Sequence, residues 1–99
     1  MRRSVIVAAS RTAIGSFMGS LSNIPAPQLA AVVIKDLINK TGIDANLVEE
    51  VILGNVLTTA EGQSPARQAI IFSGLPKSAG ALTIGKVCGS GLKAVMLAD

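Results

Sequence analysis

The chain has 99 residues, of which 49% are hydrophobic, with a formal net charge of +3, one cysteine and no histidine. Its nine lysines and arginines are scattered beside only two aromatic residues, which excludes the basic, aromatic surface that binds single-stranded nucleic acid. One cysteine excludes an internal disulfide and favours the cytoplasm. The apolar run near the start is too short for a secretory signal. Prolines interrupt the uncharged stretch 12–34, which argues against a membrane span.

The first predicted elements are a strand and a helix. "SVIVAAS", residues 4–10, is a nearly continuous apolar run, as expected of a strand that is covered on both faces. A polar loop follows over residues 11–25. From Pro27 onward apolar residues recur every three or four positions, which predicts a helix that ends at Gly42.

A second strand and helix follow. Asp44 is placed to cap one helical turn, and "VILGNVL", residues 51–57, predicts the second strand. Ser64 is a typical helix cap, the proline after it suits the first helical position, and Gly74 suits the end of that helix.

The third unit completes a β-α-β-α-β-α order. "ALTIGKV", residues 81–87, predicts a strand, and the segment from Gly89 onward predicts a helix with no stop signal before Asp99. Alternating strands and helices are typical of an α/β fold with a mostly parallel sheet. The unfinished helix and the high apolar content lead us to expect a fragment of a longer protein.

The segment "KVCGSGLKA", residues 86–94, places the only cysteine, Cys88, where the third strand passes into its helix. Ligands gather at the carboxyl ends of parallel strands, and the amino terminus of a helix stabilises a thiolate over a thiol. Gly89, Ser90 and Gly91 form a loop through which a substrate could approach closely. Backbone N–H groups beside the cysteine could bind a developing oxyanion, as in other acyl-transfer enzymes.

Two other interpretations of these residues remain open. A lone cysteine between apolar residues is often an inert core side chain. The segment "GSGLKA", residues 89–94, also fits the G-x-G-x-x-A pattern of a Rossmann-like nucleotide-binding module, in which Gly89 and Gly91 would cradle phosphate and Cys88 would only pack.

Four blocks of sequence, in order and with matching spacing, resemble the thiolases. They are "VIVAASRTAIGSFMGSL", "VEEVILGNVL", "GQSPARQAI" and "LTIGKVCGSGLKAVMLA". The resemblance covers the chain from end to end. It implies an acyl-CoA C-acyltransferase that forms or cleaves 3-oxoacyl-CoA, chiefly acetoacetyl-CoA, by Claisen chemistry, with Cys88 as the nucleophile that carries the acyl group.

The resemblance also implies the surroundings of the site. The complete fold would have five layers, α-β-α-β-α, with residues 1–99 as the first portion of the amino-terminal half. Arg67 and Gln68 would brace a loop near the active site. The protein would be a homodimer or homotetramer in fatty acid metabolism that uses acetyl-CoA or another acyl-CoA, with no metal, no further cofactor, and no nucleic-acid or membrane partner. Because the family also uses a histidine and a second cysteine, we expect residues 1–99 alone to be inactive.

Overall fold

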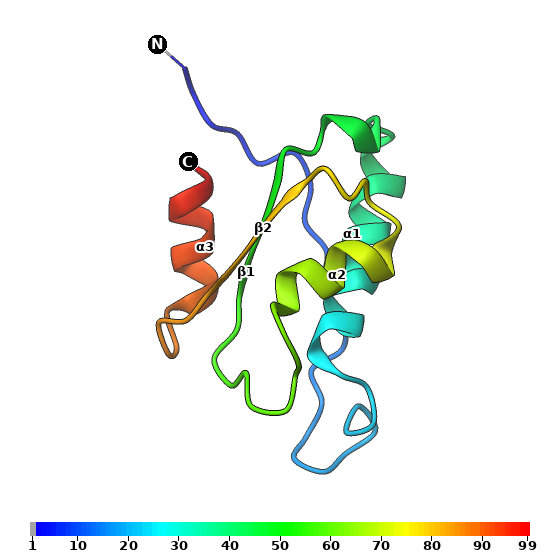
Figure 1. The fold of residues 1–99 in the computed structure, drawn as a ribbon, viewed down its shortest axis with the longest axis vertical. Coiled ribbons are helices and arrows are strands. Elements are labelled where there is room, and N and C mark those ends of the chain that lie inside the picture. Colours follow the sequence, from blue (N-terminus) through cyan, green and yellow to red (C-terminus); the bar gives the residue numbers. More distant parts are fainter. Residues whose placement is uncertain (1) are drawn as a thin grey trace.

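Helices and strands alternate along most of the chain (Figure 1). The structure is a computed structural model that describes residues 2–99. Its elements in order are α1 (Ala26–Thr41), the short 3-10 turn η1 (Ala45–Leu47), β1 (Glu50–Gly54), α2 (Pro65–Ser73), β2 (Gly80–Ile84) and α3 (Ser90–Ala98). None of the helices within residues 2–99 is long and apolar enough to cross a lipid bilayer.

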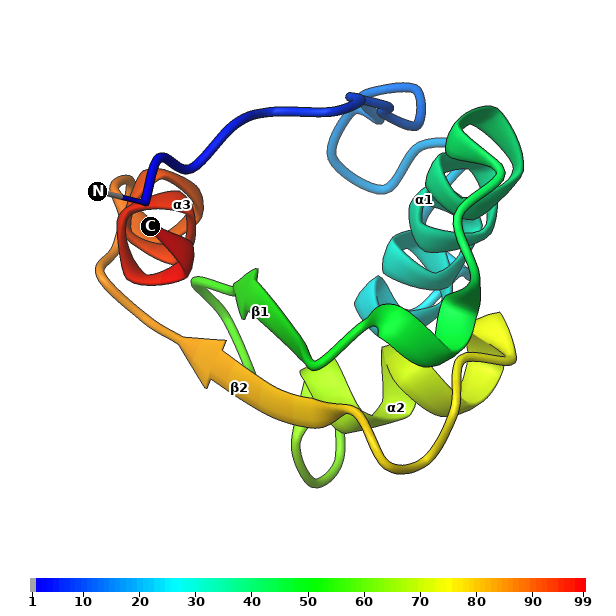
Figure 2. The same cartoon turned by 90° about the horizontal axis from the view of Figure 1, so that it is seen from above.

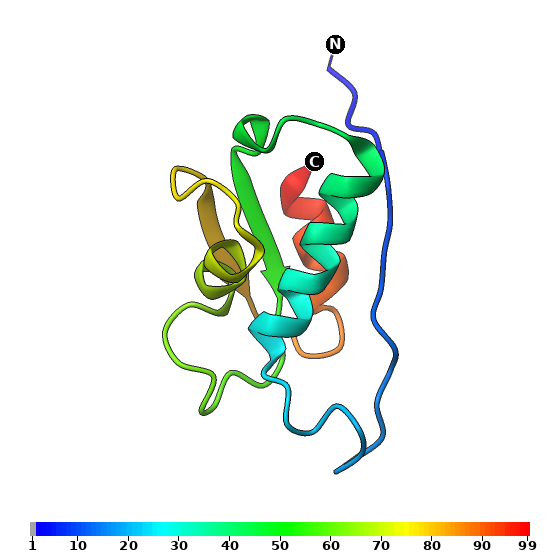
Figure 3. The same ribbon diagram turned by 90° about the vertical axis from the view of Figure 1, so that its right-hand side faces the viewer.

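The two strands lie side by side in parallel. Glu50 pairs with Gly80 at one end and Gly54 with Ile84 at the other, so the carboxyl ends of both strands lie at the same edge. Helix α2 connects the strands and contacts both, and α1 packs against α2. Helix α3 covers the opposite side of the strands (Figures 1 and 3). This arrangement confirms the α/β class and the parallel sheet.

The structure confirms the helix caps that were predicted at Asp44, Ser64, Gly42 and Gly74. The Ser64 hydroxyl accepts a hydrogen bond from the Arg67 N–H at 3.3 Å at the start of α2, and Asp44 caps η1. Gly42 and Gly74 end α1 and α2 with φ values of 66° and 78°, in the left-handed region that glycine adopts at low cost. These local rules therefore account for the start of α2 and for the ends of α1 and α2.

The core lies between α2, the strands and one side of α1. Ile70, Leu75 and Ala79 are buried there, and Ile34 and Ile38 of α1 are among the partly buried side chains that pack against them. Ile70 has no exposed surface. Burying a side chain of this size contributes roughly 1.5–3 kcal/mol to folding, so this cluster holds α1 and α2 to the sheet.

The strand predicted over residues 4–10 is not formed. This segment is extended and has no strand partner among residues 2–99, and it runs from the end of α3 to α1, apart from β1 (Figure 2). Val5, Ile6 and Val7 are 74–84% exposed. A strand requires a neighbouring strand to pair its backbone N–H and C=O groups, and β1 pairs only with β2 within the described residues.

The two strands that do form are shorter than predicted. They cover residues 50–54 and 80–84, whereas the apolar runs extend over 51–57 and 81–87. Pairing continues for only one further hydrogen bond, from the Asn55 N–H to the Ile84 carbonyl at 3.0 Å. After that the two segments separate, so the apolar residues that follow belong to loops at the carboxyl edge.

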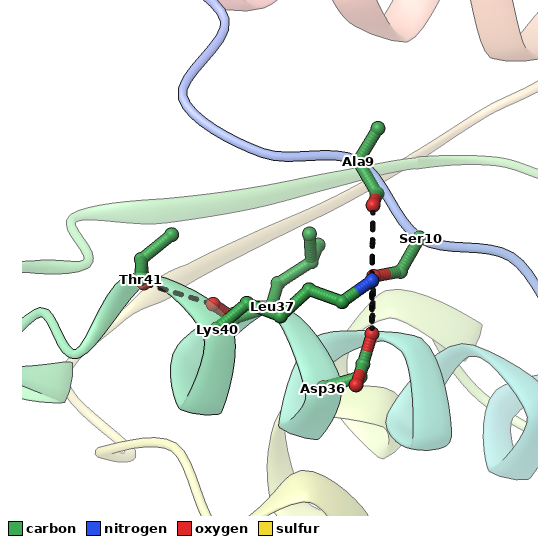
Figure 4. Close-up of polar contacts among 6 residues, drawn as sticks. All are labelled: Ala9, Ser10, Asp36, Leu37, Lys40 and Thr41. Carbon is green, nitrogen blue, oxygen red and sulfur yellow. Dashed lines mark hydrogen bonds and ion pairs between the residues drawn. The ribbon is translucent and has the colours of Figure 1, made fainter.

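Polar contacts hold the extended segment to α1 (Figure 4). The Ser10 hydroxyl donates to the Asp36 carboxylate, and the Lys40 ammonium lies 2.9 Å from the same carboxylate. Lys40 also donates to the Ser10 hydroxyl at 2.9 Å and to the Ala9 carbonyl at 3.4 Å. The hydrogen bond from Ser10, assisted by Lys40, lowers the pKa of Asp36 below its ordinary value.

Candidate active site

The loop between β2 and α3 lies at the carboxyl edge of the sheet (Figure 1). Cys88 belongs to this loop. The position agrees with the strand-to-helix junction predicted from the sequence. Its side chain is exposed. The thiol is therefore not a core side chain of this part of the molecule, and that interpretation is wrong for residues 2–99.

The N–H groups that follow the cysteine are used within its own turn. The Gly89 N–H donates to the Lys86 carbonyl at 3.0 Å, and the Ser90 N–H donates to the Val87 carbonyl at 3.2 Å. An oxyanion hole made of these two donors, which the acyl-transfer analogy suggested, is not available in this structure. The two bonds instead shape a tight turn on which Cys88 is carried.

Ser90 lies inside this turn. Its side chain is only 2% exposed, whereas the sequence suggested a place in the substrate-approach loop. The hydroxyl accepts a hydrogen bond from the Lys86 N–H at 2.7 Å and donates to the Val87 carbonyl, also at 2.7 Å. Both polar functions of the hydroxyl therefore serve the backbone on the amino-terminal side of Cys88.

The strained backbone position of the turn is Val87. Its φ of 47° lies in the left-handed region, which costs a β-branched residue about 1–3 kcal/mol. Gly89 has a φ of −89° and needs no glycine for its conformation. Gly91 has no heavy atom of another element within 4 Å of the place that a Cβ would occupy. The unusual conformation thus falls directly before Cys88 and not on the glycines after it.

Gly54 allows the end of β1 to touch the start of α3. A Cβ at Gly54 would lie 2.4 Å from the carbonyl carbon of Ser90 and 2.5 Å from the nitrogen of Gly91. Neither atom can move without shifting the helix. Sequence analysis missed this residue, although a glycine inside an apolar strand run often indicates a close backbone approach.

Arg67 and Gln68 hold neighbouring loops to α2. The Gln68 side-chain amide donates to the Glu61 carbonyl at 2.6 Å and to the Gln63 carbonyl at 3.0 Å. The Arg67 guanidinium donates to the Lys77 carbonyl at 3.2 Å. The structure therefore gives both side chains loop-bracing contacts, with Gln68 acting on the loop between β1 and α2.

Thr83 joins the start of α2 to the same edge of the sheet. Its hydroxyl accepts a hydrogen bond from the N–H of Ala66, a fully buried residue, at 3.0 Å. Helices α2 and α3 thus both begin where β1 and β2 end. A threonine within a strand carries no pattern that would have indicated this role.

The charge near Cys88 is positive. Residues 85–98 contain two lysines, Lys86 and Lys93, and no acidic residue. Within residues 2–99, no three histidine, cysteine, aspartate or glutamate side chains lie close enough together to hold a metal ion. The local charge therefore favours an anionic ligand.

A parallel α/β sheet with an exposed cysteine before a helix defines a class of site suited to covalent transfer. Comparisons with known proteins then identify the family. The family described as "Thiolase, N-terminal domain" matches residues 4–99. The chain is 62% identical over 97 residues to the acetyl-CoA acetyltransferase of Pseudomonas aeruginosa, covering 98% of this chain and 25% of that protein.

Other relatives agree with this match. A mitochondrial acetyl-CoA acetyltransferase of Danio rerio is 56% identical over 95 residues, which are 96% of this chain and 23% of the relative. The crystal structure of the Ascaris suum Acat5 thiolase in complex with coenzyme A superposes with a TM-score of 0.87 at 42% identity. The match covers 91% of this chain and 24% of that one.

The chain therefore belongs to the thiolase family, in the region of its N-terminal domain. It spans about a quarter of the length of the curated relatives it matches. The thiolase resemblance and the corresponding fold are confirmed. The Rossmann-like alternative for "GSGLKA" finds no support in any of these matches.

Proposed function

We propose that residues 1–99 are the first part of the N-terminal domain of an acyl-CoA C-acyltransferase. The enzyme would form or cleave 3-oxoacyl-CoA, chiefly acetoacetyl-CoA, through an acyl thioester on Cys88. The observation that carries this proposal is the exposed thiol of Cys88 on a tight turn between β2 and α3. The names of the relatives, acetyl-CoA acetyltransferases at up to 62% identity, support the same reaction class.

In the proposed first step, the Cys88 thiolate attacks the thioester carbonyl carbon of acetyl-CoA. A new bond forms between the Cys88 sulfur and this carbon, the bond between the carbon and the CoA sulfur breaks, and CoA leaves as a thiolate that takes up a proton. Splitting one difficult condensation into two easier steps is the usual gain from a covalent intermediate. The lysines at positions 86 and 93 and the positive start of α3 suit the binding of an anionic CoA thioester.

The proposed substrates and surroundings follow from the same family. The Ascaris suum thiolase was crystallised with coenzyme A, which supports a CoA thioester as substrate. We propose no metal and no cofactor besides this substrate, a homodimer or homotetramer, and a cytoplasmic enzyme of fatty acid metabolism. Groups for proton transfer would come from outside these 99 residues, because the chain holds no histidine and no second cysteine.

The test is to trap the intermediate in the complete protein. Incubated with acetyl-CoA alone and quenched in acid, it is expected to carry one acetyl group on the peptide that contains Cys88, as detected by mass spectrometry. Cys88→Ser should lower turnover by at least about 1,000-fold, because a hydroxyl is far less ionised than a thiol. Residues 1–99 on their own should show no turnover.

A relocated thiol provides the control. The double variant Cys88→Ser with Ser20→Cys keeps one exposed thiol but moves it to the loop before α1. We expect no acetyl group on it, because this thiol lacks the turn and the helix start. Acetylation at another residue of the unmodified protein, or substantial turnover by Cys88→Ser, would show that Cys88 is not the nucleophile.

A further inference from the structure

Ser90 carries a polar side chain that is almost completely buried. Within residues 2–99, no other polar or charged residue is as deeply buried. Burying a hydroxyl is costly unless its donor and its acceptor are both satisfied. Here both are satisfied, and both partners lie in the turn that carries Cys88.

The two partners of the hydroxyl flank the strained position. One bond comes from the N–H of Lys86 and the other goes to the carbonyl of Val87, so the left-handed conformation of Val87 lies between them. A residue in such a conformation persists only where surrounding contacts oppose its relaxation. The Val87 carbonyl has a second partner, because it also accepts a hydrogen bond from the Ser90 N–H. The Lys86 N–H, in contrast, has the Ser90 hydroxyl as its acceptor in this turn.

The position of Ser90 itself is fixed from the other side. The end of β1 rests against its backbone at Gly54, where even a Cβ would overlap the Ser90 carbonyl carbon. Ser90 is also the first residue of α3. The backbone of Ser90 is therefore held by both the sheet and the helix. Its hydroxyl hydrogen-bonds the turn and so restricts the movement of the turn relative to them.

We propose that Ser90 is a positioning residue for Cys88, whose buried hydroxyl holds the turn from Lys86 to Cys88 and thereby fixes the thiol against the start of α3. This inference rests on the proposed acyl transfer by Cys88. Both hydrogen-bonding functions of the Ser90 hydroxyl are used by the backbone of the turn. Its contribution is geometric, and a displacement of the nucleophile by about 1 Å can reduce a rate by about 100-fold.

A matched pair of variants in the complete protein separates positioning from folding. Ser73 also donates its hydroxyl to the carbonyl three residues earlier, that of Ile70, at 2.9 Å, but in α2. Ser90→Ala should slow single-turnover acetylation of Cys88 by about 10- to 100-fold, with CoA affinity unchanged. Ser73→Ala should leave the acetylation rate unchanged, although both variants lose the same kind of hydrogen bond.

A conservative variant and an exchange measurement complete the test. Ser90→Thr retains a hydroxyl and should acetylate faster than Ser90→Ala. In the unmodified protein, the Lys86 amide should exchange its hydrogen slowly, because its acceptor, the Ser90 hydroxyl, is buried. This measurement does not need the variant, so it tests the hydrogen bond even if Ser90→Ala fails to fold. The proposal is overturned if Ser90→Ala acetylates as fast as Ser73→Ala, if Ser90→Ala matches Ser90→Thr, or if the Lys86 amide exchanges freely.

The same experiment distinguishes this inference from the proposed function. If the unmodified protein is not acetylated on Cys88, the acyl-transfer proposal fails, and the positioning role fails with it. If the unmodified protein is acetylated and the two alanine variants behave alike, the acyl-transfer proposal stands and only the role of Ser90 is rejected.

Discussion

Two apolar runs of this chain have different fates. Residues 4–10 and β1, Glu50–Gly54, are both apolar runs that read as strands, yet only β1 is paired. β1 has β2 beside it and α2 and α3 on its two sides. The first run has polar contacts at α1 and at the end of α3, but no strand lies beside it in the part of the chain that the structure describes, and Ile6 is 84% exposed.

The difference shows that strand propensity is only part of what makes a strand. Neighbouring backbone groups must complete the ladder, and an apolar run without them remains an extended, exposed segment. A second apolar surface also lacks a covering element among the described residues. It is a hollow of about 660 Å³ between β1 and α3, whose lining includes Ile52, Leu53 and Val95. The apolar side chains that line this hollow are therefore left partly uncovered by residues 2–99.

The largest expected effect comes from the same substitution made in each region. Ile70→Ala should lower the free energy of unfolding by about 3 kcal/mol, because it empties a fully buried position. Ile6→Ala should change it by less than about 0.5 kcal/mol, because that side chain is mostly exposed. Urea unfolding of the 99-residue chain, followed by far-UV circular dichroism, measures both. Equal losses would contradict the contrast between the regions.

A second, smaller effect sharpens the view of how β1 is held. Gly54→Ala should destabilise the chain by about 2 kcal/mol, because the added methyl group overlaps the backbone of α3. Gly91→Ala is the matched control. It has open space at that position and should stabilise α3 by roughly 0.5–1 kcal/mol, since alanine favours a helix over glycine.

Thermal unfolding of the two variants should therefore move in opposite directions. A Gly54→Ala variant as stable as the unmodified chain would show that the close approach of β1 to α3 can be relaxed. In that case the start of α3 would not be held by the sheet, and the support for Ser90 described above would be lost.

Local chemistry made much of the fold predictable. Ser64, Asp44, Gly42 and Gly74 mark the ends of helices, and each acts as its residue type predicts. The position of Cys88 at a strand-to-helix junction was also predictable, because the apolar run, the glycines and the following helical spacing are all local. What these features share is that a few neighbouring residues determine them.

The remaining features depend on contacts between distant residues. The pairing of residues 4–10 requires a partner edge that no local pattern specifies. The contact of Gly54 with Ser90 joins positions 36 apart in the sequence. The left-handed conformation of Val87 contradicts the preference of a β-branched residue and is retained because the surrounding turn imposes it. Sequence analysis therefore located the proposed nucleophile, Cys88, but not the contacts that shape the turn around it.

The smallest expected effect concerns the attachment of the extended segment to α1. The hydrogen bond from Ser10, followed by the interaction with Lys40, lowers the pKa of Asp36 below its ordinary value of 3.8. A carboxyl group with a lowered pKa in the folded chain stabilises the contact when ionised. That contribution is complete above about pH 3.8 and is lost as the pH falls through the lower folded value.

Nuclear magnetic resonance can follow this loss directly. The amide signals of Ala9 and Ser10 should change on acidification with a midpoint below pH 3.8, as the Asp36 carboxylate that holds Ser10 takes up a proton. Asp36→Asn should abolish this titration and leave the segment less protected from hydrogen exchange at neutral pH. Asp44→Asn, which alters a carboxylate that caps η1, should leave the titration unchanged. A midpoint at or above 3.8, or an unchanged titration in Asp36→Asn, would show that Asp36 does not hold the segment to α1.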